Sequence, residues 1–355
     1  MTAISSSAKT IDSQWIFPLS ALRNTPTPYP VHKFLYDLAR GVEFLYRLGT
    51  SLKLPSPALF TAATWLHRFY MRYSMEDFHR QDVAAACIFL ATKTEECGRK
   101  LRDVARVYHS KVSGIDVTTI AEADDSPEVD QYQSNILLTE EYLLEAICFD
   151  FTVESPHAEL VDLFYLGRED YLLQDYAWSL AHDSYRTPIC LLYPPRITAT
   201  ACYVLAQRLV DGPNSPSLDA RISFAAPSAS LPTPPSHKAA SPDESRLAID
   251  HFALSEDDLR SVSGALSVLL EFYSVQDMSS HPYLSAVASI PPPTLSSGWE
   301  HLYTPPDPDQ VVAPASASGP PTSLNGDDLS GRTPSSTHGD STPAASQPGA
   351  PPTTT

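Results

Sequence analysis

Two pairs of adjacent carboxylates, Glu95-Glu96 and Glu140-Glu141, are residues whose type could support general acid–base chemistry. Such chemistry needs carboxyl groups that are held within reach of one substrate. Side chains that are neighbours along a helix do not face each other. We therefore interpret both pairs as solvated helix surface, and we predict that the chain has no catalytic residues and is not an enzyme.

Other patterns that carry chemistry are missing from the sequence. It contains no G-x-G-x-x-G, G-x-x-x-x-G-K-[ST], G-x-S-x-G or H-E-x-x-H pattern. The eleven histidines are scattered, and the two closest are His67 and His79, so no helix presents two metal ligands one turn apart. The five cysteines show no C-x-x-C spacing, which is typical of small core residues in a reducing compartment. We predict no cofactor and no metal site.

Length and charge limit the class of protein. The 355 residues allow two domains of about 100–150 residues each, together with tails. The sequence shows neither a signal-like segment nor 18 consecutive apolar residues, which predicts a soluble intracellular protein without membrane association. The net charge is −18, made up of +6 over residues 1–111 and −24 over the remainder. Such an acidic chain is a poor nucleic-acid binder, so we expect its partners to be proteins.

Residues 82–96 (DVAAACIFLATKTEE) indicate a helix that is buried on all sides, because no polar face interrupts residues 83–92. Lys93, Glu95 and Glu96 then end this apolar rod with charge. A second copy of the pattern follows, in which Ala201-Cys202 and Leu205-Ala206 match Ala86-Cys87 and Leu90-Ala91. Two such rods predict two helical bundles in tandem.

Apolar residues at helical spacing predict the helices around each rod. We expect the first rod to be accompanied by helices at residues 31–53, 56–73, 101–112 and 128–149, and the second, at residues 195–210, by helices at 157–166, 171–184, 244–251 and 255–276. The predicted fold class is therefore all-α, with two five-helix bundles. The predicted divisions are an arm (1–30) that docks on the first bundle, the first bundle (31–152), the second bundle (153–276) and a tail (277–355).

Two segments have the composition of mobile chain. Residues 212–243 are rich in proline and serine, and residues 277–355 hold 15 of the 33 prolines and a single basic residue. We expect the first to be a mobile insertion and the second a disordered tail whose deletion leaves the folded core stable. Thr304-Pro305, Thr333-Pro334 and Thr342-Pro343 are hypothetical phosphorylation sites in that tail.

Four local motifs accompany the two predicted bundles. They are Trp15-Ile16-Phe17, residues 67–71 (HRFYM), Lys93-Thr94-Glu95-Glu96 and Phe149-Asp150-Phe151. With these motifs, the tandem five-helix bundles resemble the cyclin fold, and the chain is similar to the transcriptional cyclins, of the cyclin K and cyclin T type and of the fungal beta subunit of the RNA polymerase II C-terminal-domain kinase. The similarity extends over roughly residues 13–276 and is weaker over the second bundle.

The resemblance implies a surface that binds a kinase. In that family a lysine that ends the third helix and a glutamate in the fifth hold the kinase backbone, and these positions match Lys93 and Glu140. A family aromatic that fills a groove of the kinase matches Phe149. The predicted kinase interface consists of Phe89, Lys93 and Glu96 on one helical stripe, Glu140 and Leu144 on another, and Phe149.

Simpler interpretations of these residues remain open. Lys93 could pair with Glu96 within its own helix, Glu140 could be a solvated carboxylate, and Phe149 could be a core ring. A basic run is interpreted either as a solvated helix face or as a docking patch for acidic partners. It comprises Arg99, Lys100, Arg102, Arg106 and Lys111.

The resemblance predicts a nuclear regulatory subunit that binds and activates a cyclin-dependent kinase and so promotes transcription elongation by RNA polymerase II. One alternative is a cyclin of another branch, which would serve a cell-cycle or splicing kinase. Another is a DNA-binding general transcription factor of the same fold, which the acidic second half disfavours. The sequence leaves open which kinase is bound and whether a third regulatory subunit is required.

Overall fold

Every regular element that the computed structural model describes is a helix. The described residues are 14–122, 126–167, 170–223, 245–294 and 301–304, and all of them belong to one compact unit, Met1–Asp307. The predicted all-α class is confirmed for these residues. None of their helices is both long and apolar enough to cross a bilayer. Residues 224–243 of the predicted insertion, residue 244 of the next predicted helix and the tail beyond residue 304, with Thr333 and Thr342, lie outside the described residues.

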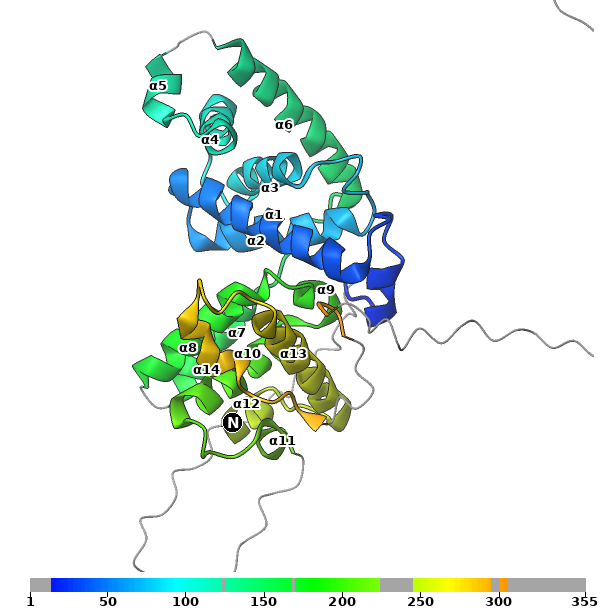
Figure 1. The fold of residues 1–355 in the computed structure, drawn as a ribbon, viewed down its shortest axis with the longest axis vertical. Helices are drawn as coiled ribbons and strands as arrows, with labels where there is room; N and C mark the ends of the chain where they lie inside the picture. The colour runs from blue at the N-terminus through cyan, green and yellow to red at the C-terminus, as the bar shows by residue number, and fades with distance from the viewer. Residues whose placement is uncertain (1–13, 123–125, 168–169, 224–244, 295–300, 305–355) are drawn as a thin grey trace, which may run out of the picture. The chain divides into compact units, whose positions relative to one another are not determined.

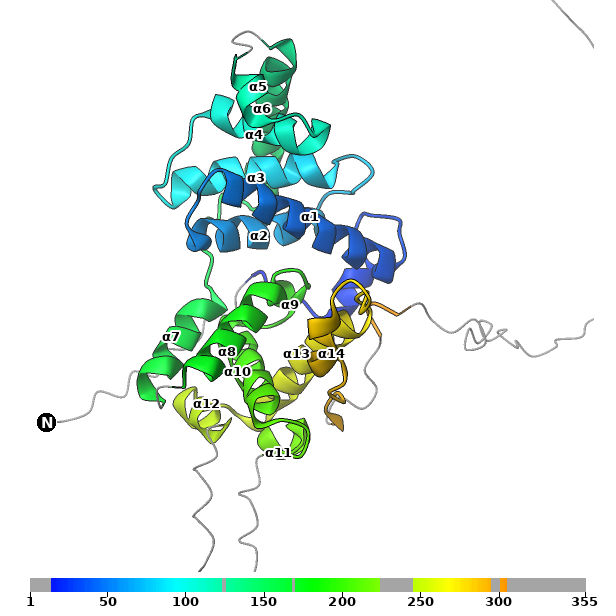
Figure 2. The same ribbon diagram turned by 60° about the vertical axis from the view of Figure 1, so that its left-hand side comes forward.

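Helix α3 (Arg80–Thr94) is the rod at the centre of the first group of helices, and its residues 83–92 are all buried. This confirms the interpretation drawn from the missing polar face. The small alanines of α3 let the neighbouring helices approach closely. The helices packed around it (Figures 1 and 2) are α1 (Val31–Ser51), α2 (Ser56–Tyr70), α4 (Leu101–Ser113) and α6 (Pro127–Ala146).

Helix α10 (Pro195–Asp211) is the second rod, and its residues 197–207 are buried in the same way. The helices that pack against it are α7 (Pro156–Leu166), α8 (Tyr171–Ser184), α9 (Ile189–Leu192), α11 (Leu218–Arg221), α12 (Ser245–His251) and α13 (Glu256–Ser274). Ser255 caps the start of α13, because the Ser255 and Asp258 side chains each accept a hydrogen bond from the other's backbone N–H.

Two segments predicted to lack helices contain short ones. The acidic loop after α4 contains α5 (Val117–Glu122), which buries Ile120. The predicted mobile insertion begins with α11, where Ile222 is fully buried and the Arg221 guanidinium pairs with Asp211 at 2.6 Å. Composition alone did not reveal that Arg221 and Ile222 are buried in the folded unit, and the mobility of the insertion stays a prediction.

The prediction of a disordered tail from residue 277 was wrong for its first part. The chain continues after α13 through the turn η2 (Pro282–Leu284) and the short helix α14 (Ser285–Ala288), which packs on α13. Apolar side chains anchor this part of the chain, since Val287, Ile290, Leu302 and Tyr303 are all buried. The division of the chain into an arm, two bundles and a tail at residues 30, 152 and 276 stays a prediction.

Gly49 lies inside α1 and marks a close approach between helices rather than the end of the helix. A Cβ atom at this position would overlap the end of the Leu59 side chain of α2 and would lie 3.1 Å from the Ile88 side chain of α3. An alanine here would therefore require the Leu59 side chain to move. Helix α2 begins at Ser56, with Pro55 in the N-cap position.

The N-terminal arm docks through Trp15, which is buried. The Arg68 guanidinium of α2 lies 4.7 Å from the centre of the Trp15 ring, and the indole N–H donates a hydrogen bond to Asp150 at 2.9 Å. Burial raises the pKa of Asp150, but the hydrogen bonds from Trp15 and Gln14 outweigh it, so the pKa lies below its ordinary value. The Phe17 N–H donates to the Leu191 carbonyl of α9, so the arm contacts both groups of helices.

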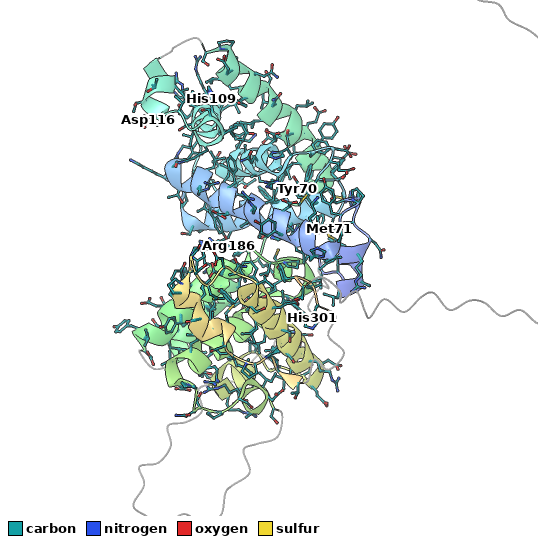
Figure 3. All side chains as sticks on the ribbon, in the orientation of Figure 1. Tyr70, Met71, His109, Asp116, Arg186 and His301 are labelled. Atoms are coloured by element: carbon teal, nitrogen blue, oxygen red, sulfur yellow. The ribbon has the colours of Figure 1, made fainter. Side chains whose placement is uncertain are left out.

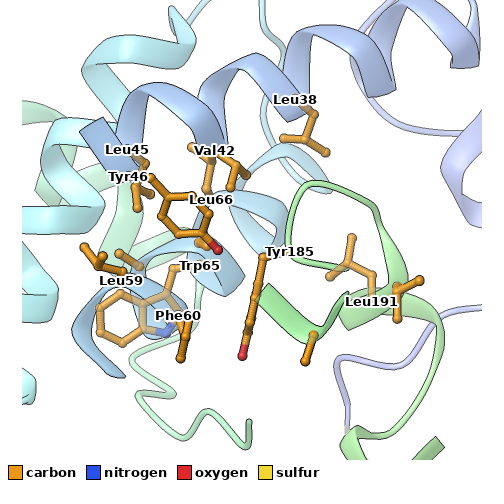
Figure 4. Packing of buried hydrophobic residues seen from close by; sticks show 14 of the residues in the cluster. Leu38, Val42, Leu45, Tyr46, Leu59, Phe60, Trp65, Leu66, Tyr185 and Leu191 are labelled. Carbon is orange, nitrogen blue, oxygen red and sulfur yellow. The ribbon is translucent and has the colours of Figure 1, made fainter. Parts of the chain in front are cut away.

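Aromatic rings join the first group of helices to the second. Phe60 of α2 stacks with His157 of α7 and with Tyr185, whose ring centres lie 4.0 and 5.0 Å from its own, and Figure 4 shows Phe60 and Tyr185 facing each other. Beside this stack, His67 is fully buried, and its Nε2–H donates to the Tyr185 carbonyl at 2.7 Å. Two histidines are thus held in an apolar environment that disfavours their charged form.

We expect the free energy of unfolding to decrease as the pH is lowered from 7 toward 4, because of His67. Burial lowers its pKa to about 4, although the hydrogen bond to Tyr185 opposes this effect. Since the folded state binds the proton less readily than the unfolded state, the stabilisation present above the ordinary pKa is lost as the pH falls toward 4. At pH 5 the loss is roughly 2 kcal/mol for this residue.

Thermal unfolding of the wild-type chain and of His67→Gln at pH 7 and pH 5 checks this expectation. The glutamine amide can keep the hydrogen bond to Tyr185 but does not titrate, so the difference between the two pH values should shrink in the variant. An equal pH difference in both proteins would show that His67 does not control it.

Candidate functional site

Lys93 and Glu140 form an ion pair that joins the end of α3 to the middle of α6. The Lys93 side chain is 47% exposed, whereas the Glu140 side chain is only 8% exposed. The structure therefore brings together the two residues singled out as the centre of the site. The interpretation of Glu140 as a solvated carboxylate was wrong, and Lys93 pairs with another helix rather than with Glu96.

Phe89 also contacts the Lys93 ammonium group. The Lys93 ammonium lies 4.2 Å from the centre of the Phe89 ring, one turn earlier on α3, and this ring is almost fully buried. A cation over an aromatic face is attracted by the negative potential of the ring. The ring and the buried carboxylate together fix where the ammonium group points.

Glu96 does not lie on the predicted stripe. Helix α3 ends at Thr94, and Glu96 has a φ of +52°, so its side chain no longer follows the helical spacing from Phe89 and Lys93. Its neighbour Glu95 accepts a hydrogen bond from the Thr61 hydroxyl of α2 at 2.7 Å. The stripe prediction was wrong for Glu96 because the helix terminates before that residue.

Phe149 is exposed, so its interpretation as a core ring was wrong. Its side chain is 66% exposed, and both Cys148 and Phe149 have a φ of +55°. The Phe149 N–H donates to the Leu144 carbonyl at 3.0 Å, which closes the end of α6. This left-handed turn directs the chain off the helix axis and leaves an aromatic ring on the surface.

Further exposed apolar residues on α6 were missed by the sequence reasoning. Leu137 lies one turn before Glu140 on the same face and is 48% exposed, and Leu138 and Tyr142 are also exposed. The i, i+3, i+7 spacing of Leu137, Glu140 and Leu144 was the available signal. We define the α3–α6 surface as Phe89, Lys93, Leu137, Glu140, Leu144 and Phe149, of which Leu137 and Phe149 are the exposed apolar members.

Arg99 belongs to the folded framework rather than to a docking patch. Its guanidinium donates to the carbonyls of Leu52 and Lys53, after α1, and to those of Cys97 and Gly98, before α4, at 2.7–3.1 Å. Both interpretations of the basic run therefore fail for this residue. The Arg99 guanidinium joins the segment after α1 to the segment before α4, and these hydrogen bonds account for its position.

The α3–α6 surface offers binding groups without catalytic groups. Lys93 has further N–H donors beyond its bond to Glu140, and a carboxylate accepts several hydrogen bonds, so the pair can engage the backbone of another chain. The apolar residues around it can exclude water from such an interface. Within the described part of the chain, no group of three or more histidine, cysteine, aspartate or glutamate side chains could hold a metal ion.

Part of the chain matches a known protein family and several of its members. Residues 37–152 match the family described as cyclin, N-terminal domain. The chain is 38% identical over 198 residues to cyclin pch1 of Schizosaccharomyces pombe, a match that covers 55% of this chain and 57% of that protein. It is 33% identical over 202 residues to cyclin-K of Danio rerio, covering 55% of this chain and 45% of the relative.

Two further matches are to a human cyclin and to a solved structure. Human cyclin-T2 is 29% identical over 204 residues, which is 56% of this chain and 28% of that protein. The chain thus matches from about a quarter to little more than half of the length of these relatives. Among solved structures, the crystal structure of the yeast RNA Pol II CTD kinase CTDK-1 complex contains a chain with a TM-score of 0.54 and 20% identity. That match covers 81% of this chain and 83% of the other, and it shows a shared fold.

Proposed function

We propose that the chain is a cyclin, a regulatory subunit that binds and activates a cyclin-dependent kinase, because residues 37–152 match the cyclin N-terminal domain family and the chain is similar to cyclin pch1. It contributes a docking surface rather than chemistry of its own. The observation that carries this proposal is the Lys93–Glu140 pair, which joins α3 to α6, together with the exposed apolar side chains of Leu137 and Phe149 on the same surface.

Activation follows from how such a surface meets a kinase. A protein kinase is active when a lysine of its sheet and a glutamate of its regulatory helix form an ion pair. A rigid partner that packs against that helix stabilises the paired state and shifts the kinase toward it. Lys93 and Glu140 would hold the kinase backbone in register, while Phe149 and Leu137 would bury apolar area beside it.

We further propose that the kinase phosphorylates the C-terminal domain of RNA polymerase II and thereby promotes transcription elongation in the nucleus. The support is the similarity to the relatives named cyclin-T2, cyclin-K and cyclin pch1, together with the motifs that resemble the transcriptional branch. The structural neighbour from a C-terminal-domain kinase complex agrees with this choice of branch.

The experiment is to purify the tagged full-length chain from its native cells and identify what accompanies it. We expect a stoichiometric cyclin-dependent kinase and, in the same eluate, kinase activity on a peptide of polymerase C-terminal repeats. A third stoichiometric protein would be a further subunit of the complex.

The charge-exchanged variant Lys93→Glu with Glu140→Lys is the control for specificity, and it should recover no kinase. Recovery of a cell-cycle or splicing kinase would overturn the assignment to transcription but keep the regulatory role. Recovery of promoter DNA without any kinase would overturn both.

A further inference from the structure

The segment His301, Leu302, Tyr303 and Thr304, here called the HLYT segment, is bound to α13 by a single carboxylate. Glu271 accepts hydrogen bonds from the backbone N–H groups of Leu302 at 3.0 Å, Tyr303 at 2.9 Å and Thr304 at 3.2 Å. The Thr304 hydroxyl donates to the same carboxylate at 3.3 Å, and His301 Nδ1 lies 3.4 Å from it. Successive backbone N–H groups that converge in this way form an anion-binding nest.

Two apolar side chains anchor the same segment. Leu302 and Tyr303 are 2% and 8% exposed, and the Tyr303 ring lies 5.6 Å from that of Phe272, the residue after Glu271 on α13. The Glu271 side chain is itself 8% exposed. A buried carboxylate is stable only while donors compensate for its lost hydration, so the HLYT segment and Glu271 stabilise each other. Figure 3 shows His301 beside α13.

Thr304 is the exposed end of this segment. Its hydroxyl is an acceptor for a phosphoryl group, and Pro305 follows it in the sequence, which is the pattern that proline-directed kinases use. Of the three Thr-Pro pairs in residues 277–355, this is the pair whose threonine lies among the described residues. Its hydroxyl faces a carboxylate, so a new negative charge on it would be adjacent to an existing one.

We propose that Thr304 is a phosphorylation site and that its phosphorylation releases the HLYT segment from α13. The γ-phosphoryl group of ATP is transferred to the Thr304 oxygen, the bond to the leaving ADP breaks, and the hydroxyl proton passes to the base of the kinase. The proposal rests on the proposed function only for the source of the kinase.

Release follows from electrostatics. A phosphothreonine carries a charge of about −1.5 to −2 at pH 7, and it no longer has the hydroxyl proton that Glu271 now accepts. The Thr304 oxygen lies 3.3 Å from the Glu271 carboxylate, so a phosphate on this oxygen would be repelled by the carboxylate at short range. The nest of N–H groups cannot satisfy both anions, because the Thr304 N–H is already bound to Glu271.

The same contacts imply that the kinase phosphorylates Thr304 while the HLYT segment is detached from α13. The bonds that Glu271 makes to Thr304 compete with a kinase for this part of the backbone. Glu271→Gln removes the charge and weakens the nest, so Thr304 should be phosphorylated faster, by about fivefold. The phosphate should then have little further effect on release, because its negatively charged neighbour is gone.

The first test measures amide hydrogen exchange in the full-length chain with phosphothreonine incorporated at position 304 during synthesis, so that no kinase is needed. We expect the amides of Leu302, Tyr303 and Thr304 to exchange about tenfold faster than in the unmodified chain, with the centre of α13 unchanged. In the Glu271→Gln background the same phosphate should change these rates by less than about twofold. Equal rates in the phosphorylated and unmodified wild-type chains would overturn the proposed release.

The second test incubates the chain, together with its co-purified kinase, with ATP and maps phosphate by mass spectrometry. We expect phosphate on Thr304, its loss in Thr304→Val, and its retention in the control variant Thr333→Val. Absence of phosphate on Thr304 would overturn the modification site. Failure to recover any kinase would count against the proposed function alone, because the first test does not depend on it.

Discussion

Exchanging the two charges of the α3–α6 surface, Lys93→Glu with Glu140→Lys, is expected to abolish kinase activation while leaving thermal stability almost unchanged. The exchanged side chains can still pair with each other, so the loss in unfolding free energy should stay below about 1 kcal/mol. Toward a partner the donor and acceptor have changed places, and mispaired buried charges cost about 3 kcal/mol or more, which is at least 100-fold in affinity. Titration of the kinase with each variant measures the effect.

Single substitutions separate the two roles of the pair. Lys93→Glu alone places two carboxylates together, one of them on the buried Glu140, so this variant should melt at a lower temperature than the double variant. A matched control exchanges the exposed pair Arg260–Glu256 on α13, which is 2.8 Å apart and distant in sequence from the surface. Full activation by the Lys93/Glu140 exchange would show that these residues do not contact the kinase.

Ending the chain after Gln276 is expected to lower stability by about 3 kcal/mol, whereas ending it after Thr304 should have little effect. The shorter chain loses four buried apolar side chains, each worth about 1.5–3 kcal/mol when fully buried, from which the entropy of ordering the segment must be subtracted. It also leaves the Glu271 carboxylate without the donors that the HLYT segment supplies. The lost side chains are Val287, Ile290, Leu302 and Tyr303.

Thermal melts of chains 1–276, 1–304 and 1–355 test this expectation. For a folded unit of this size, 3 kcal/mol corresponds to about 6–12 °C in the melting temperature. Adding Glu271→Ala to chain 1–276 should recover part of the loss, because the buried charge is then removed. If chain 1–276 melted at the temperature of the full chain, the contacts of residues 277–304 would contribute no net stability.

Composition indicated that residues 277–355 contribute nothing to the stability of the folded core, whereas the buried side chains of residues 287, 290, 302 and 303 are expected to stabilise it. Proline content and the near absence of basic residues describe the average of a segment, and the average over residues 277–355 is that of a disordered chain. A few apolar residues placed correctly are enough to dock part of such a segment. Composition therefore failed here because apolar residues such as Leu302 and Tyr303 are few in this part of the sequence. Their effect comes from their burial, including the contact of Tyr303 with Phe272 of α13.

The sequence by itself determined the elements whose information is local. The missing polar face of residues 83–92 and of residues 197–207 specified two buried rods, and Ser255 followed by Asp258 specified the start of α13. The identity of Lys93 and Glu140 as the centre of the site came from motif resemblance, and their role at an interface with a kinase stays a prediction.

Only the tertiary structure decided what depends on residues far apart in the chain. It paired Lys93 with Glu140, turned Phe149 outward through two left-handed residues, and joined Glu271 to the backbone of residues 302–304. Helical spacing fixes the face on which a side chain lies but not which other helix covers that face. That choice is made by packing the helices around the two rods, where burial and hydrogen bonding of the whole chain are satisfied together.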